Sequence, residues 1–240
     1  MSNGFRSVAA QFTAVGSVSK GFWLSGAVIN GAAQHTGSVN PVELQMLKPD
    51  GTVNIDYSFT YHKGDTSYYY KNFNGWYNAA KKAVKADTAT DVFFPVGTGL
   101  WLSGTDTTLS FQTSGEVVMD TVQCNLTNGF VMIANPYPVA IKLSSIEILG
   151  AEQHTGSVNP VELQMLKTDG TVNIDFSFTY HKGDTSYYYK NFNGWYNAAK
   201  KPIKPDTATE VMIPAGAAVW VSSSSNDFKI VIPTPFEDAE

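Results

Sequence analysis

The sequence predicts an all-β protein made of two tandem, homologous domains, each a β-sandwich or a barrel-like sheet. Three observations predict this fold: a strong internal repeat, strict alternation of apolar residues, and turn motifs rich in Gly, Pro, Asn and Asp between the alternating stretches. Hydrophobic residues make up 43% of the 240 positions, so each half of the chain is long and apolar enough to bury its own core.

The internal repeat has an offset of 119 residues. Residues 34–82 match residues 153–201 at 47 of 49 positions without a gap. Duplication of an ancestral module explains such a match, and we expect the same register to hold through both modules. The first β-module is therefore placed at residues 1–119 and the second at residues 120–240, each close to ordinary domain size.

The flanks of the repeated block agree less well. Residues 12–31 match residues 131–150 at only 4 of 20 positions, while residues 83–104 match residues 202–223 at 10 of 22. Two explanations stay open. Either the middle block was recopied locally, or the flanks diverged because they face different neighbours, which would favour a directional head-to-tail contact between copies.

Apolar residues alternate along residues 42–46 and 53–61, which is typical of half-buried strands. Pro49-Asp50-Gly51 between them predicts a hairpin turn. Turn residues further along the chain delimit four more expected strands, at residues 67–72, 90–96, 99–103 and 108–113. Helical periodicity is scarce, and short helical turns are expected only at residues 78–85 and 143–149.

Charged residues make up 15% of the chain, against about 25% in average soluble proteins. The surface must therefore be rich in hydroxyl and amide groups, as is common where subunits pack together or face the outside of a cell. The net charge is -5, Arg6 is the only arginine, and no basic stripe is present. Nucleic acid is therefore not an expected partner.

Cys124 is the only cysteine, which excludes a disulfide within the chain and a site with several cysteine ligands. Residues 1–15 contain no apolar stretch long enough for a signal peptide, and no transmembrane helix is predicted. Membrane insertion is thus not expected. An extracellular protein with this sequence would have lost its leader, used a leaderless route or left the cell by lysis.

Short motifs in the second half occur in a recognisable order: Gly129-Phe130, Asn135-Pro136-Tyr137-Pro138, Gly194-Trp195-Tyr196, and Pro214-Ala215-Gly216 before Trp220. This series resembles repeated β-modules of bacterial exported and surface proteins. The first half keeps Gly75-Trp76-Tyr77 but has Gly16-Ser17-Val18-Ser19 where Asn-Pro-Tyr-Pro would fall. The resemblance implies an extracellular β-domain without catalytic residues.

The densest aromatic cluster follows the second expected strand and recurs 119 residues later. Its candidate ligand or interface residues are Tyr68, Tyr70, Trp76, Tyr77, Tyr187, Tyr189, Trp195 and Tyr196. Alternation places part of this cluster in the core, and the rest is interpreted as a subunit interface, where Tyr and Trp are enriched. Alternatively, the flat rings stack on pyranose rings while neighbouring Asn side chains bind the sugar hydroxyls.

No motif predicts an enzyme, a cofactor or a metal site. His35 and His62, with their counterparts His154 and His181, lack metal-ligand spacing and are expected to be solvated or hydrogen-bonded loop residues. Residues 50–56 superficially resemble a calcium loop but lack its terminal Glu, although a calcium ion between subunits stays open. No nucleophile motif or phosphate-binding loop is present.

The sequence therefore predicts a structural protein that assembles with copies of itself into an extracellular or cell-surface filament, tube or layer. The expected contacts are edge strands and aromatic-rich faces, with residues 7–18 and 117–126 as candidate edges. A carbohydrate-binding surface module that uses the Tyr and Trp clusters is the alternative, with a glycan as its partner.

Overall fold

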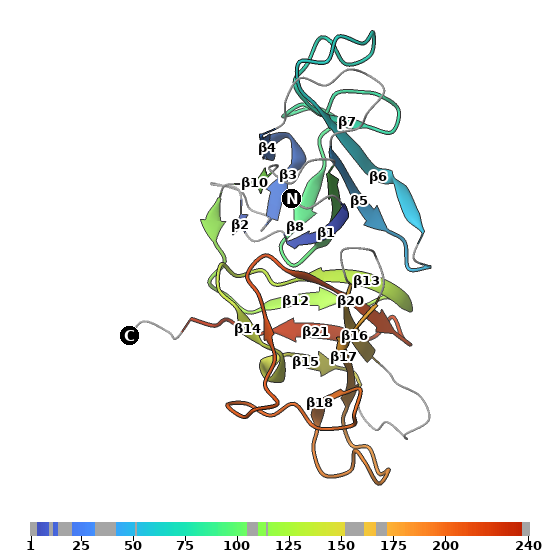
Figure 1. The fold of residues 1–240 in the computed structure, drawn as a ribbon, viewed down its shortest axis with the longest axis vertical. Helices are drawn as coiled ribbons and strands as arrows, with labels where there is room; N and C mark the ends of the chain where they lie inside the picture. Colours follow the sequence, from blue (N-terminus) through green and yellow to red (C-terminus); the bar gives the residue numbers. More distant parts are fainter. Residues whose placement is uncertain are drawn as a thin grey trace.

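The computed structural model describes residues 4–9, 12–13, 21–31, 42–50, 52–104, 110–113, 115–151, 161–166 and 172–236. Over these ranges the protein is all-β, with antiparallel sheets and two single-turn 3-10 helices (Figure 1). The predicted fold class is confirmed at this level. Residues 1–119 are called the first half below, and residues 120–240 the second half.

The first half contains β1 (Gly4–Ala9), β2 (Phe12–Thr13), β3 (Gly21–Trp23), η1 (Leu24–Gly26), β4 (Val28–Asn30), β5 (Val42–Leu47), β6 (Val53–His62), β7 (Gly75–Asn78), β8 (Phe93–Pro95), β9 (Gly99–Gly104), β10 (Ser110–Gln112) and β11 (Glu116–Val117). Its main sheet has the order β1-β9-β5-β6-β7. Three separate two-stranded sheets, β10-β4, β3-β8 and β11-β2, complete the first half.

The second half contains β12 (Val122–Asn125), β13 (Gly129–Ala134), β14 (Ile141–Lys142), η2 (Leu143–Ser145), β15 (Glu147–Leu149), β16 (Val161–Leu166), β17 (Val172–His181), β18 (Gly194–Asn197), β19 (Met212–Ile213), β20 (Ala218–Ser223) and β21 (Lys229–Ile232). Its main sheet, β13-β20-β16-β17-β18, has the same strand order as that of the first half. The sheet β12-β21-β15 and the pair β14-β19 accompany it.

The repeat register of 119 residues is wrong for the first strand of each main sheet. Gly4 of β1 pairs with Gly104, whereas Gly129 of β13 pairs with Ser223. Ser223 lies 119 residues after Gly104, but Gly129 lies 125 residues after Gly4. The register returns to 119 at β3 and β14, so the first half holds six additional residues between β1 and β3.

Alternation places the core of the first half as predicted. Val42, Leu44, Phe59 and Tyr61 are buried on one face of the β5-β6 hairpin, and the register of this hairpin shifts at a bulge between Gln45 and Leu47. The backbone N–H of Lys48 donates to the carbonyl of Thr52 at 2.8 Å, which closes the predicted turn. Gly51 of that turn lies outside the described residues.

Several expected elements differ from the structure. Residues 67–72 form turns instead of a strand, because the carbonyl of Ser67 accepts from the N–H groups of Tyr70 (3.2 Å) and Lys71 (3.0 Å). Residues 78–85 form no helical turn, since Lys81 has a positive φ of 59°. Residues 143–149 hold one 3-10 turn and then β15.

The other strand predictions are confirmed in part. The strand expected at residues 99–103 is β9, and the one expected at residues 90–96 is the shorter β8. Of the strand expected at residues 108–113, the structure describes residues 110–113, which contain β10. Strand β7 was not predicted, because Asn74-Gly75 was interpreted only as a turn. The missed strand matters most, since it carries two of the candidate site residues.

The two halves pack directly on each other. Trp101 of β9, Met132 of β13 and Trp220 of β20 belong to one apolar cluster between the two main sheets. The N–H of Ala134 donates to the carbonyl of Gly97 at 2.9 Å, and a Cβ added to Gly99 would lie 2.7 Å from the Cβ of Met132. Only glycine allows this close approach.

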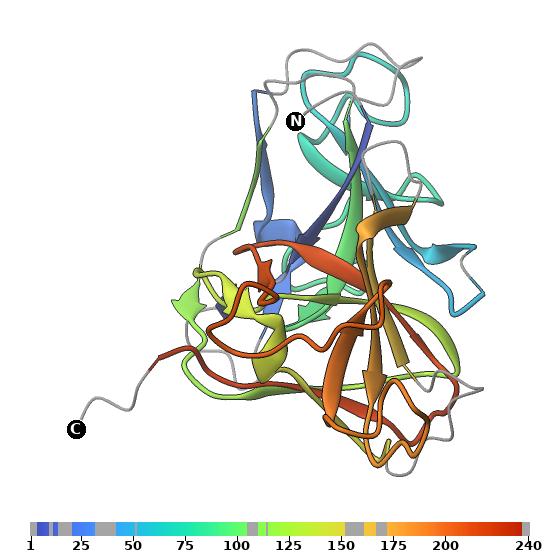
Figure 2. The same ribbon diagram turned by 60° about the horizontal axis from the view of Figure 1, so that its bottom comes forward.

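The packing leaves equivalent loops far apart. The β6-β7 loop lies at one end of the long axis and the β17-β18 loop at the other, in both views (Figures 1 and 2). A surface feature carried by these loops is therefore presented twice, at opposite ends of one molecule.

Candidate functional site

The two predicted tryptophans are core residues. Trp76 in β7 is buried, and its indole Nε1 donates to the carbonyl of Ala27 at 2.8 Å. Trp195 in β18 is buried in the same way and donates to the carbonyl of Ile146 at 2.8 Å. Both rings also lie edge-on against a tyrosine of the neighbouring strand, at 5.2 Å. Strand pairing turns both indoles inward, so neither of these candidate ligand or interface residues presents its ring to solvent.

Tyr77 and Tyr70 support the loop from within. Tyr77 is buried, and its hydroxyl donates to the carbonyl of Phe73 at 2.9 Å. The half-buried Tyr70 stacks on the imidazole of His62, with ring centroids 3.7 Å apart. Tyr196 and Tyr189 repeat these contacts in the second half. Four further candidate residues thus hold the loops in shape instead of facing solvent.

The exposed part of each aromatic cluster is a tyrosine pair at the loop tip. Tyr68 is 77% exposed and Tyr187 is 78% exposed, so these two predicted residues do face solvent. Each packs edge-on against the next residue of the aromatic cluster, Tyr69 or Tyr188, which is not among the candidate site residues. The ammonium of Lys81 lies 4.3 Å from the centre of the Tyr69 ring, a cation-π contact that leaves a basic rim around the pair.

A buried His-Asp pair anchors each loop. The Nδ1 atom of His62 lies 3.0 Å from Oδ2 of Asp65, and its Nε2 lies 2.9 Å from Oγ1 of Thr60. The other Asp65 oxygen accepts from the N–H of Ser67 at 2.7 Å. The side chains of His62 and Asp65 are both 1% exposed. The expectation of a loop histidine at position 62 is therefore wrong, since His62 ends strand β6 in the interior.

The order hydroxyl, imidazole, carboxylate is also that of a hydrolase triad. Here, however, Tyr70 covers one face of the imidazole and Tyr77 packs against it edge-on. These two rings and the Asp65 carboxylate enclose the imidazole on one face, at its edge and at Nδ1. We therefore assign the arrangement an anchoring role, and Thr179, His181 and Asp184 repeat it with the same distances.

Burial sets the protonation of this pair. Burial lowers the pKa of His62 below its usual value, and the hydrogen bond and charge of Asp65 offset only part of that effect. Burial alone would raise the pKa of Asp65, but the hydrogen bonds from Ser67 and His62 outweigh it and hold this pKa below its usual value. His181 and Asp184 shift in the same directions.

These shifts predict lower stability in mild acid. Because the folded pKa of His62 and His181 is depressed, the unfolded chain binds protons first as the pH falls through about 6.5. The free energy of unfolding should be nearly constant between about pH 7 and 8, fall below about pH 6.5, and fall further near pH 4, where the unfolded chain binds protons at Asp65 and Asp184. Urea unfolding at pH 8, 6 and 5 measures this. A His62→Gln/His181→Gln variant should lose the first decline, and an unchanged decline would contradict this origin.

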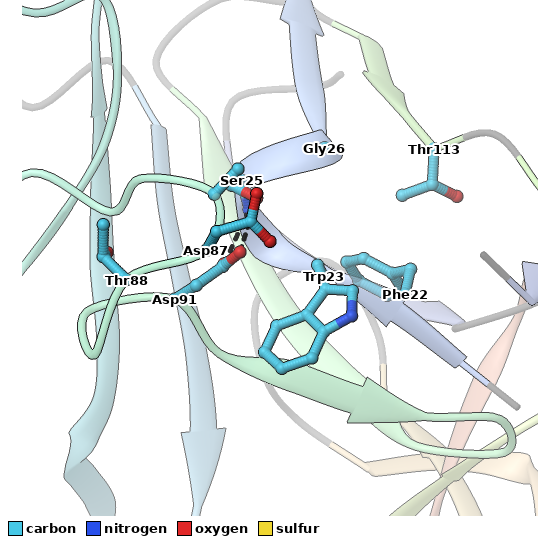
Figure 3. A pocket seen from close by; sticks show the side chains of 9 residues that line it. Phe22, Trp23, Ser25, Gly26, Asp87, Thr88, Asp91 and Thr113 are labelled. Atoms are coloured by element: carbon cyan, nitrogen blue, oxygen red, sulfur yellow. Dashed lines mark hydrogen bonds between the residues drawn. The ribbon is translucent and has the colours of Figure 1, made fainter. Parts of the chain in front are cut away.

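A second surface feature lies beside η1 of the first half. A cavity of about 490 Å³ is lined by Phe22, Trp23, Ser25, Gly26, Ala86, Asp87, Thr88, Asp91 and Thr113 (Figure 3). The indole of Trp23 is 45% exposed and packs against Phe93, with ring centroids 5.2 Å apart. Ser25 fixes one carboxylate, since its hydroxyl donates to Oδ2 of Asp91 at 2.6 Å and its N–H to Oδ1 at 3.1 Å.

Sequence reasoning missed this cavity. Its residues come from β3, η1, the segment before β8 and the end of β10, and no local motif joins them. One signal was available in the repeat, because position 23 is Trp where the second half has Lys142. A lysine and an indole present different chemistry to the same neighbours.

The described part of the chain offers little other chemistry. Within it, no three His, Cys, Asp or Glu side chains cluster as metal ligands. Burial raises the pKa of Cys124 to about 11, so its thiol is poorly nucleophilic at neutral pH. No helix among the same residues combines the length and apolarity needed to span a bilayer.

Comparison with known proteins leaves the geometry as the basis for function. No protein-family model matches the chain, and neither does any of the curated proteins or solved structures compared with it.

Proposed function

We propose that this is a structural protein whose copies assemble into an extracellular or cell-surface filament, tube or layer. In this proposal its two halves are tandem, homologous β-sandwich domains, at residues 1–119 and 120–240, which act as one stiff unit. The identical strand order of the main sheets and the apolar contact between them support that organisation. The observation that carries the proposal is an open sheet edge at β10.

Among the described residues, strand β10 lacks a neighbour that its counterpart has. In the second half, β21 lies between β12 and β15, as Figure 1 shows. In the first half, β10 pairs with β4, the counterpart of β15, and no described strand takes the place of β12. Ile230 of β21 is buried in its core, whereas the equivalent Phe111 is only half-buried.

An open edge presents N–H and C=O groups that another chain can pair with. Three of the four edge strands of the main sheets, β7, β18 and β13, each have a backbone group paired with a neighbouring segment. The N–H of Val84 donates to the carbonyl of Trp76 on β7, and the N–H of Ile203 does the same to Trp195 on β18, both at 2.8 Å. The N–H of Phe130 on β13 donates to the carbonyl of Pro49 at 2.8 Å. The open edge of β10 is therefore a specific place for contact between copies.

The tyrosine pairs supply a second kind of contact. Because the β6-β7 and β17-β18 loops lie at opposite ends, each copy presents the same exposed rings to two neighbours (Figure 2). Tyrosine is enriched at protein interfaces, where it adds contact area at a low cost in conformational entropy. Growth in more than one direction, as in a layer, follows if both contacts are used.

Carbohydrate binding is the second candidate function, and one observation favours it. The ring of Tyr68 is 77% exposed, so one flat face is open to a pyranose. The buried Trp76 and Trp195 take no part in this version. A glycan array with wild-type protein and a Tyr68→Ala/Tyr187→Ala variant tests it, because binding through the loop tips must be lost in the variant.

Charge on β10 is expected to block assembly. Ser110→Lys places an ammonium on the exposed edge strand, and pairing with another chain would bring that charge into the interface. The concentration at which polymers form should rise by about tenfold or more, which corresponds to roughly 1.4 kcal/mol. Sedimentation velocity and negative-stain microscopy measure this. Ser145→Lys, on the exposed end of η2, is the matched control and should assemble normally.

Wild-type protein that stays monomeric at millimolar concentration would overturn the assembly proposal. Equal assembly of wild type, Ser110→Lys and the control would show that β10 is not the contact, and would leave the tyrosine pairs as the remaining surface.

A further inference from the structure

The residues around the cavity beside Trp23 have counterparts in the second half. With the 119-residue register, Asp87 corresponds to Asp206 and Trp23 to Lys142. In the second half, the Nζ atom of Lys142 lies 2.7 Å from Oδ1 of Asp206, in an ion pair across the equivalent surface. This protein thus already places a primary ammonium on that carboxylate in one of its two halves.

In the first half the carboxylate is present and the lysine is not. No Lys or Arg of the described chain forms an ion pair with Asp87 or Asp91, and both carboxylates line the cavity. Figure 3 shows the two carboxylates close to Ser25, with the Trp23 indole beside them. Two carboxylates without a cation beside an open cavity make a site of negative potential.

We propose that this cavity binds an alkylammonium group, which takes the place that the Lys142 ammonium has in the second half. The carboxylates of Asp87 and Asp91 accept charge-assisted hydrogen bonds from the ammonium. The exposed face of Trp23 attracts the same cation, because indole is the side chain with the strongest cation-π interaction. The cavity volume of about 490 Å³ falls in the usual range for small-molecule sites.

The site is built before the ligand arrives. Phe93 packs against the indole of Trp23, and three donors hold Asp91 in place: the N–H and hydroxyl of Ser25, and the N–H of Val92 at 2.9 Å. Little conformational entropy is lost on binding, so a small cation can be held by few contacts. The ammonium is that of a free polyamine or of a lysine side chain in a polypeptide, and the chemistry is the same.

Titration by NMR of isotope-labelled protein tests the proposal. The probes are spermidine, N-acetyl-lysine methylamide, the uncharged N-acetyl-norleucine methylamide, and a neutral disaccharide. The two amines should shift the amide signals of Gly26 and Asp87 in a saturable manner, and binding should weaken several-fold in 0.5 M salt, where the Debye length is only a few ångströms. Tighter binding of spermidine or of the lysine derivative distinguishes the two sources.

Variants copy the difference between the halves. Trp23→Lys installs the second-half residue, whose own ammonium should pair with Asp87 and abolish amine binding. Asp87→Asn should weaken binding by about tenfold, while Asp206→Asn, in the second half, should leave it unchanged. The same spectra report whether each variant is folded. The proposal would be overturned if the norleucine derivative or the disaccharide bound as well as the amines, or if Trp23→Lys bound amines as well as the wild type does. The proposal does not depend on assembly through β10.

Discussion

Replacing Trp76 with alanine is expected to lower the free energy of unfolding by about 3–5 kcal/mol, and Trp195→Ala is expected to do the same. Both indoles are buried, and each truncation leaves a large cavity. The loss also removes the indole N–H that donates to the carbonyl of Ala27 or Ile146, which adds the cost of a lost buried hydrogen bond. The two effects should be similar, because the surroundings of the two rings are nearly identical.

Urea denaturation with a tryptophan-independent readout, such as far-ultraviolet circular dichroism, measures these changes. Tyr68→Ala is the matched aromatic control, since its exposed ring should contribute less than about 0.5 kcal/mol. If Trp76→Ala kept full stability but lost binding of a glycan or of another copy, the indole would be a surface residue and its assignment to the core would be wrong.

The aromatic cluster shows which parts of the structure the sequence predicts and which it does not. Alternation correctly predicts the β5-β6 hairpin, because period-2 burial is a local property of strands. The same reasoning treats residues 67–72 as a strand, since a run of tyrosines has high strand propensity. The actual turns depend on Asp65, which accepts from the Ser67 N–H while it pairs with His62. Residue propensities do not describe that hydrogen-bond network. In the loop that the network holds, Tyr68 is exposed, whereas Trp76, on the strand that follows, is buried.

The register of the repeat illustrates a different limit. The identical block fixes the offset of 119 residues so strongly that the six-residue difference near the start was overlooked. A signal was present, because Asn3-Gly4-Phe5 recurs as Asn128-Gly129-Phe130 at an offset of 125. Strand pairing shows that Phe5 and Phe130 are equivalent positions, because Phe5 pairs with Ser103 and Phe130 pairs with Ser222. Ser103 and Ser222 are themselves 119 residues apart.

Neither the position of the open edge nor that of the cavity could be predicted, because each depends on which distant segments the fold brings together. The edge of β10 is recognisable only when β12 is seen beside β21. The cavity requires Trp23 and Asp87 to be adjacent although 64 residues separate them. In both cases the repeat supplies the reference against which the unusual position is noticed.

Replacing His62 with alanine is expected to lower the free energy of unfolding by about 3 kcal/mol, because it leaves the Asp65 carboxylate buried without its imidazole partner. The stacking surface of Tyr70 is lost as well. Thr60→Val, which removes only the hydroxyl that contacts Nε2, should cost about 1 kcal/mol and serves as the matched comparison. Unfolding at pH 8 keeps the histidine of the wild type neutral, so its own protonation does not contribute to the difference.

His181→Ala should produce the same loss in the second half, since the His181-Asp184 distance is also 3.0 Å. The two loops lie at opposite ends of the molecule, so the double variant should lose the sum of the two effects if the halves unfold as one unit. Two separate transitions would instead mean that the apolar contact around Trp101 and Trp220 is too weak to couple the halves. A loss below about 1 kcal/mol for each single variant would show that the loops are held by their tyrosines, and that the buried His-Asp pair has a role other than anchoring.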